Sequence, residues 1–210
     1  MMSAVELAHQ HVLAALLDGD LRPGQWIRQD DLAAELGISK VPVREALQRL
    51  TAEGLVTFET NRGSAVRSLT AADAEEIYAL RLALEPMLLE RSITNLSIVD
   101  LATADLALTS RGSSIGEANW HFHRALYAGA HWDRAVTLVG RLHAAVAPYV
   151  VLYTQELSGS SASDKEHRKL LKLCQAAKTQ RAVDLLRQHL KEASAALVAF
   201  LRPPAAGSTS

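Results

Sequence analysis

The chain of 210 residues is long enough for two modest domains, and its composition, 49% hydrophobic and 21% charged, is typical of a globular protein. A single cysteine, Cys174, excludes an internal disulfide, and the lack of a charged-then-apolar leader or an uninterrupted apolar run of about 18 residues predicts a cytoplasmic protein without a membrane partner. The net charge of −1 argues against a non-specific coat on nucleic acid and suits a protein whose basic residues are gathered on one face.

Residues 30–54 (DDLAAELGISKVPVREALQRLTAEG) predict two short amphipathic helices joined by a tight turn. Gly37 supplies the left-handed residue at which the first helix ends, and Ile38 is placed to fold back as an apolar closing contact. Ser39 can cap the second helix, and Pro42 is tolerated in its first turn because the missing donor costs little there. We expect the first helix to bury Leu32, Ala33 and Leu36. This arrangement is a helix-turn-helix, which indicates DNA binding.

The second of these helices has one apolar and one polar face. The inward positions, spaced four and three residues apart, are Val43, Leu47 and Leu50. A row of polar side chains four residues apart lies on the opposite side, made by Lys40, Arg44 and Gln48. This row is free to enter a groove of DNA.

Two short runs rich in β-branched residues, 55–59 and 64–69, follow this helix and are separated by the turn residues Asn61, Arg62 and Gly63. A helix-turn-helix followed by a hairpin is a winged helix, which we assign to residues 1–68. Although residues 1–70 contain more acids than bases, the cations concentrate in the second helix and the wing, at Lys40, Arg44, Arg49, Arg62 and Arg67. Charge placed where phosphate would lie argues against the alternative of a small α+β packing unit with solvated charges.

The run from Leu17 to Val66, with its LRPGQ turn, ISKVPVREALQRLTAEGLV core and NRGSAV wing, resembles the DNA-binding domain of GntR-family bacterial transcription regulators. The resemblance implies a homodimer that binds a short palindromic double-stranded DNA operator. We expect DNA contacts from Arg28, Ser39, Lys40, Val41, Pro42, Arg44, Gln48, Arg49, Asn61, Arg62 and Gly63. Lys40 and Val41 stand where the family pattern usually has Arg and Thr, which keeps the charge, removes a hydroxyl and leaves the operator preference open.

Residues 69–203 have helical periodicity and few strand-forming residues, which predicts an all-helical second domain and a mainly α protein. Capping-box spacings mark three helix starts, at Thr70 with Asp73, Ser114 with Glu117, and Ser163 with Glu166. We count about six helices, at 70–93, 97–110, 115–130, 132–156, 163–177 and 179–201, followed by a disordered tail at 204–210.

Polar residues interrupt the apolar faces of three of these helices. Asn119 and His123 are four residues apart on one such face, and other apolar stripes contain His167 and His189. A lone core histidine is more often simply hydrogen-bonded, but three on three helices favour convergence on a divalent metal, for which neutral imidazole is a common ligand. We leave three other histidines out of this site: His121, which is about 200° around the helix from His123, His131 and His143.

The segments IYALRLALEP, NWHFHRAL, EHRKLL and QHL resemble the FCD ligand-binding domain of one GntR subfamily, of the FadR-like type with the six helices of its VanR-type group. In that domain an Asp or Asn and three His bind a divalent metal. Carried over position by position, these ligands are Asn119, His123, His167 and His189. Asn119 stands where the family commonly has Asp, so the site loses one negative charge and some affinity. The ligand set suits zinc, nickel or manganese.

Arg81 and Glu85 are four residues apart on the first helix of this domain. One interpretation is a surface ion pair worth well under about 1 kcal/mol. The resemblance suggests instead that Arg81 faces the effector pocket, where its guanidinium would hold a carboxylate through two hydrogen bonds. Both interpretations stay open at this point.

Together these features predict a transcription regulator, specifically a repressor, and not an enzyme. We expect it in the bacterial cytoplasm at the nucleoid, with a small organic acid as its effector. The segment 68–72 is the expected hinge through which the effector changes operator affinity. Two alternatives are a metal-dependent hydrolase, for which we find no convincing general base near the histidines, and an architectural DNA-binding protein, for which the near-neutral charge and the large second domain are wrong.

Overall fold

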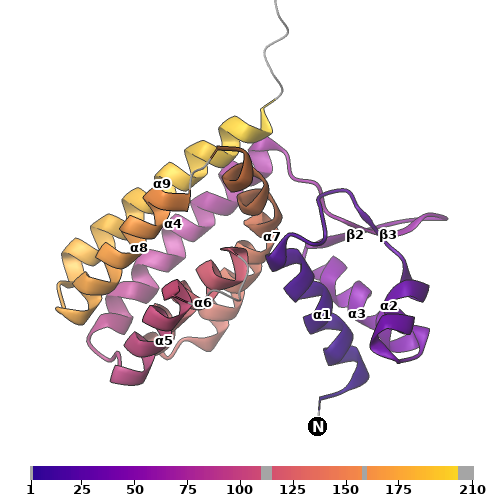
Figure 1. Cartoon of the computed structure of the whole chain (residues 1–210), viewed down its shortest axis with the longest axis horizontal. Coiled ribbons are helices and arrows are strands. Elements are labelled where there is room, and N and C mark those ends of the chain that lie inside the picture. The colour runs from indigo at the N-terminus through magenta and orange to yellow at the C-terminus, as the bar shows by residue number, and fades with distance from the viewer. Residues whose placement is uncertain (1, 110–114, 158–159, 203–210) are drawn as a thin grey trace, which may run out of the picture.

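Figure 1 shows the computed structural model, which describes residues 2–109, 115–157 and 160–202. An N-terminal winged helix-turn-helix is followed by a helical domain, and the predicted mainly α architecture is thereby confirmed. The predicted tail at 204–210 lies outside the described residues.

The N-terminal part combines helices with a small sheet. Its elements are α1 (Ala4–Asp18), β1 (Trp26–Ile27), α2 (Gln29–Leu36), α3 (Lys40–Ala52), β2 (Val56–Glu59) and β3 (Gly63–Val66). The strands pair antiparallel in the order β1-β3-β2, with Trp26 opposite Ala65 and Val56 opposite Val66. β2 and β3 form the predicted wing, whereas α1 and β1 were not predicted. The sequence does contain a signal for α1, because its buried apolar residues are spaced four apart, at Ala8, Val12 and Leu16.

The turn between α2 and α3 follows the local chemistry of the sequence. Gly37 has a left-handed φ of 64°, and the backbone N–H of Ile38 donates to the carbonyl of Ala33 at 3.1 Å. Ser39 occupies the N-cap position of α3, but its hydroxyl makes no capping hydrogen bond. Leu32 and Ala33 are buried as predicted, and Leu36 packs against the same core but is only partly buried. The inward face of α3 is confirmed at Val43, Leu47 and Leu50.

The helical domain contains the predicted long helices with small shifts at their ends. They are α4 (Ala71–Ile93), α5 (Ile98–Thr109), α6 (Ile115–Tyr127), the 3₁₀ helix η1 (Ala128–Ala130), α7 (Asp133–Leu157), α8 (Ser160–Gln175) and α9 (Thr179–Leu201). Thr70 and Asp73 form the predicted capping box. The predicted start at Ser163 is wrong because α8 begins at Ser160. The predicted cap at Ser114 lies outside the described residues.

Helix α7 belongs to both halves of the molecule (Figure 1). Val139 and Val146 lie in the core of the helical domain, whereas Ala144 and Ala147 lie in the core of the winged helix. The segment Asp133–Leu152 is long and apolar enough, by length and composition alone, to cross a membrane. Apolar residues of α7 pack into the two hydrophobic cores of the folded protein, which is the pattern of a core helix.

Close contacts join the two halves. Gly116 at the start of α6 lies so near α1 that a Cβ at this position would be 2.1 Å from the carbonyl oxygen of Leu17. The backbone N–H of Leu69 donates to the Tyr149 hydroxyl of α7 at 2.6 Å. The expected hinge at 68–72 is therefore attached to α7 at Leu69.

Candidate functional site

The outer face of α3 carries the predicted polar row. Lys40, Arg44 and Gln48 are exposed, and Val41 beside them is 64% exposed. Lys40 pairs with Asp30 of α2 at 2.6 Å. Within the described part of the chain, Arg44 has no ion-pair partner, so its guanidinium is available for phosphate or a base edge.

The remaining predicted DNA contacts surround this row. Arg49 lies 4.0 Å from Glu6, and Arg62 lies 3.6 Å from Glu59 in the wing, both in exposed pairs that hold these cations weakly. Asn61 and Gly63 have left-handed φ values of 70° and 99° and form the tip of the wing. The other predicted positions are exposed or half-buried at the N-terminal ends of α2 and α3: Arg28, Ser39 and Pro42.

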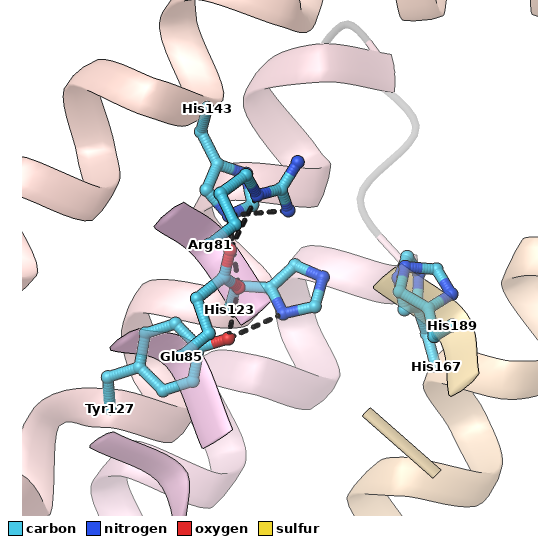
Figure 2. Close-up of polar contacts among 7 residues, drawn as sticks. All are labelled: Arg81, Glu85, His123, Tyr127, His143, His167 and His189. Atoms are coloured by element: carbon cyan, nitrogen blue, oxygen red, sulfur yellow. Dashed lines mark hydrogen bonds and ion pairs between the residues drawn. The ribbon is translucent and has the colours of Figure 1, made fainter. Parts of the chain in front are cut away.

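Three of the predicted ligands come together inside the helical domain (Figure 2). His123 of α6, His167 of α8 and His189 of α9 each offer a ring nitrogen, and these nitrogens lie within 4.8 Å of one another. The Nε2 atoms of His167 and His189 are 3.3 Å apart. His123 is fully buried, and His167 is 5% exposed. This geometry suits a single divalent ion bound by imidazole.

Asn119, the fourth predicted ligand, lies one helical turn before His123 on α6. It lines a small cavity of about 40 Å³ together with Arg81, His143 and His189. The cavity places Asn119 beside the histidine cluster and brings Arg81 to the same space.

Two of the three clustered histidines are held by hydrogen bonds on the side away from the cluster. His123 Nδ1 lies 3.2 Å from the Tyr127 hydroxyl, which itself donates to Glu85 Oε2 at 2.5 Å. His189 Nδ1 lies 2.7 Å from Glu166 Oε2. The Nε2 atom of His123 is buried and has no hydrogen-bond partner among the described residues. An orphaned buried nitrogen facing two other imidazoles is the feature that a bound cation would satisfy.

Arg81 and Glu85 form a buried pair, so the surface ion-pair interpretation is wrong. Arg81 Nε donates to Glu85 Oε1 at 2.5 Å, and both side chains are at most 4% exposed. Arg81 Nη2 also donates to His143 Nε2 at 2.9 Å, and the guanidinium carbon lies 4.8 Å from the ring centroid of Tyr78. The helical repeat places the side chains of residues 81 and 85 on the same face of α4. Packing of this face against α6 and α7 removes the pair from water.

His143, which the sequence analysis leaves out of the metal site, is also absent from the group of three converging histidines, but it lines the cavity beside them. It is 2% exposed, contacts Arg81 and Glu85, and its ring centroid is 5.3 Å from that of His123. A signal was present in the sequence, because His143 is four residues after Val139 and three before Val146, both buried. His121 and His131, also left out, are exposed.

The buried imidazoles are neutral and Glu85 is ionised. Burial lowers the pKa of His143 to about 4 with help from the Arg81 charge, and lowers the pKa of His167 to about 3 with help from His189. Burial also holds the pKa of His123 well below its usual range. Burial opposes ionisation of Glu85, but the Arg81 charge together with the contacts from His143 outweighs it, so the pKa of Glu85 is well below its usual range. Neutral imidazoles have the lone pairs that metal binding requires.

Comparison with known proteins matches each half of the chain to a protein-family model. The family model described as FCD domain matches residues 76–192, and the model described as bacterial regulatory proteins, gntR family, matches residues 5–66. The chain is 28% identical over 191 residues to the HTH-type transcriptional repressor GlaR of Escherichia coli (strain K12), covering 83% of this chain and 87% of that protein. It is 30% identical over 125 residues to the uncharacterized HTH-type transcriptional regulator YdhC of Bacillus subtilis (strain 168), covering 55% of this chain and 56% of YdhC.

With several curated relatives, including the Nta operon transcriptional regulator of Aminobacter aminovorans, the chain spans about half of their length or less. Two solved structures match over nearly the whole chain. E. coli McbR/YncC has a TM-score of 0.85 at 22% identity and covers 96% of this chain and 100% of its own, a likeness of fold. A putative transcriptional regulator GntR from Rhodococcus sp. RHA1 has a TM-score of 0.82 at 26% identity and covers 94% of this chain and 99% of its own.

Proposed function

The chain belongs to the GntR family of bacterial regulators and carries an FCD domain, and from this premise we propose a repressor whose operator binding responds to a small carboxylate. It acts as a homodimer on a palindromic operator, in the bacterial cytoplasm at the nucleoid. The observation that carries the proposal is the exposed Arg44 row of a winged helix joined to a buried histidine cluster. The matched families and named relatives are transcriptional regulators, not enzymes, which argues against a metal-dependent hydrolase.

The histidine cluster supports binding of a divalent metal. His123, His167 and His189 would hold the ion, and Asn119 would serve as a weaker fourth ligand through its amide oxygen. When bound, the metal supplies a Lewis acid to which the carboxylate of an effector can coordinate directly. Arg81 lines the same cavity, and the guanidinium N–H groups not used by Glu85 and His143 can donate to that carboxylate.

The size of this cavity supports a link between effector binding and movement of α7. A volume of about 40 Å³ is small for an organic acid, so we infer that effector binding displaces side chains or helices around the cavity. α7 contributes His143 and Ala147 to the cavity wall, and Ala147 also belongs to the core of the winged helix. Displacement of α7 by the effector therefore reaches the DNA-binding half directly.

Glu53 provides a polar connection along the same route. It follows the last residue of α3, accepts a hydrogen bond from Arg141 Nη2 of α7 at 3.2 Å, and lies 2.9 Å from His9 Nε2 of α1. Arg141 is two residues from His143, which contacts Arg81 in the effector cavity. A shift of α7 changes the Arg141–Glu53 contact at the end of the recognition helix.

Removal of Arg44 tests the proposed DNA-binding role. We expect Arg44→Ala to weaken specific operator binding by about 1–3 kcal/mol, because an exposed guanidinium in the groove contacts phosphate or a base edge. Fluorescence anisotropy at physiological salt on the operator and on scrambled duplex measures both affinities. Arg187→Ala, which removes an exposed arginine from α9, is the matched control. Unchanged operator affinity in Arg44→Ala would contradict the proposed docking, and equal affinity of wild type for both duplexes would favour an architectural DNA-binding protein.

Removal of Arg141 tests the proposed coupling. Once a thermal-shift screen of small carboxylates has identified an effector, we expect it to change wild-type operator affinity by roughly 5–150-fold. In Arg141→Ala this factor should fall, because one of the connections between α7 and the winged helix is lost, while effector-free operator binding stays near the wild-type value. Arg134→Ala removes another exposed arginine of α7 and is the control. An undiminished response in Arg141→Ala would show that the signal bypasses Glu53.

A further inference from the structure

The residues behind the histidine cluster determine which ring nitrogen of each histidine carries the proton. We propose that Tyr127 and Glu166 are positioning residues that hold His123 and His189 with Nδ1 protonated and Nε2 bare, both aimed at one divalent metal. This inference rests on the metal site of the proposed function and adds two residues that do not themselves touch the ion.

The protons around Tyr127 determine what its oxygen can offer to His123. Its hydroxyl has one proton, which it donates to Glu85 Oε2 at 2.5 Å. Glu85 is an ionised carboxylate paired with Arg81, so it can only accept. The phenol is neutral, because burial and the Glu85 charge raise the pKa of Tyr127 well above its usual range. The Tyr127 oxygen therefore has only a lone pair to offer to His123.

This leaves one arrangement for His123. Its Nδ1 lies 3.2 Å from the Tyr127 oxygen and must be the donor, since that oxygen has no further proton. With the ring proton on Nδ1, Nε2 is the nitrogen left to bind a metal. Figure 2 shows the His123 ring with one nitrogen toward Tyr127 and the other on the side of His167 and His189. That second nitrogen is the buried atom without a hydrogen-bond partner among the described residues.

His189 is oriented in the same way by Glu166. Its Nδ1 lies 2.7 Å from Glu166 Oε2. The hydrogen bond to His189 holds the pKa of Glu166 below its usual range, so the carboxylate accepts and Nδ1 donates. With the Nδ1 proton directed at Glu166, Nε2 is the His189 nitrogen left to bind a metal, and it lies 3.3 Å from His167 Nε2. A carboxylate behind a metal-bound imidazole orients the ring and raises its basicity.

Glu166 also bears on the neutral ligand at Asn119. An amide there brings no negative charge to a divalent ion, whereas the Glu166 carboxylate lies one hydrogen bond behind His189. The charge that Asn119 lacks is thus supplied by Glu166 through the His189 imidazole, since the charge of Glu85 is already balanced by Arg81.

Cobalt(II) binding to the full-length protein tests the proposal, with affinity measured by competition against a chromophoric chelator and coordination by the visible absorption bands. We expect Tyr127→Phe and Glu166→Ala to weaken Co²⁺ binding by about 10–100-fold and to alter the bands. Glu166→Gln should recover part of the affinity, because its amide oxygen still accepts from Nδ1. The matched controls are Tyr149→Phe, which removes a buried hydroxyl bonded to Leu69, and Asp164→Ala, an exposed carboxylate of α8.

The outcomes separate this inference from the proposed function. Wild-type protein that binds neither Co²⁺ nor Zn²⁺ would overturn the metal site and the positioning roles together. Wild-type protein that binds Co²⁺, with Tyr127→Phe and Glu166→Ala within about twofold of it, would overturn the positioning roles alone. If Tyr127→Phe does not fold, Glu166 decides the matter, because its side chain is 29% exposed and tolerates substitution.

Discussion

Replacement of Arg81 by methionine is expected to lower the free energy of unfolding by about 3–5 kcal/mol. The variant leaves the Glu85 carboxylate fully buried without its cation, while the hydrogen bond from Tyr127 remains and His143 Nε2, no longer an acceptor for Arg81, can donate to Glu85. Two neutral hydrogen-bonding groups do not offset the desolvation of a charge as the guanidinium does. Urea denaturation followed by circular dichroism, without metal or effector, measures the loss.

A double variant and a surface pair serve as controls. Arg81→Met with Glu85→Leu removes both charges and should recover most of the lost stability, since the uncompensated carboxylate is gone. Arg62→Met breaks the exposed pair with Glu59 in the wing and should change stability by less than about 0.5 kcal/mol. If the free energy of unfolding of Arg81→Met lies within about 1 kcal/mol of the wild-type value, Glu85 has become protonated or hydrated in the variant. The buried pair then does not stabilise the helical domain.

The burial of this pair changes how the carboxylate clamp has to be tested. If Arg81 served only as a clamp for the effector, Arg81→Ala would weaken effector binding and leave effector-free DNA binding nearly intact. Because Glu85 depends on Arg81, an alanine variant mixes the loss of a ligand contact with loss of stability. Arg81→Lys keeps a cation beside Glu85 but lacks the planar fork, so a weaker effector response at preserved stability would isolate the clamp.

The recognition helix was predictable because its signals are local. Gly37 requires a left-handed turn, and the periodicity of α3 separates its buried face from the Arg44 row within thirteen residues. The convergence of the three histidines was also predictable in outline, since each interrupts an apolar stripe and apolar stripes meet in a core.

The partners of the histidines were not predictable in the same way. Contact of Tyr127 with Glu85, and of His143 with Arg81, depends on the relative rotation of α4, α6 and α7, which no local pattern specifies. Helix α1 was missed although its stripe is regular, because the helix-turn-helix motif begins after it. Thus the sequence identified the candidate ligands, and the packing of the helices determined how they are held.

Saturation with a divalent metal should raise the free energy of unfolding by about 4 kcal/mol when the free ion is present at about a thousand times its dissociation constant. The expectation follows from a site that exists only when α6, α8 and α9 are packed together, since the unfolded chain does not hold three imidazole nitrogens within 4.8 Å. Thermal denaturation with Zn²⁺, Ni²⁺ or Mn²⁺ and again after chelation measures the effect, and the metal giving the largest shift identifies the preferred ion.

His167→Ala should abolish most of this gain, because it removes one of the three imidazoles and leaves a pair that binds weakly. His121→Ala, which removes an exposed imidazole from α6, should retain the full gain and excludes a general effect of histidine loss. Elemental analysis after purification without chelators adds an independent measure of occupancy. If wild-type protein contains only traces of metal and no ion shifts its unfolding, the orphaned Nε2 of His123 is satisfied by something other than a cation, and the cluster is a structural feature of the core.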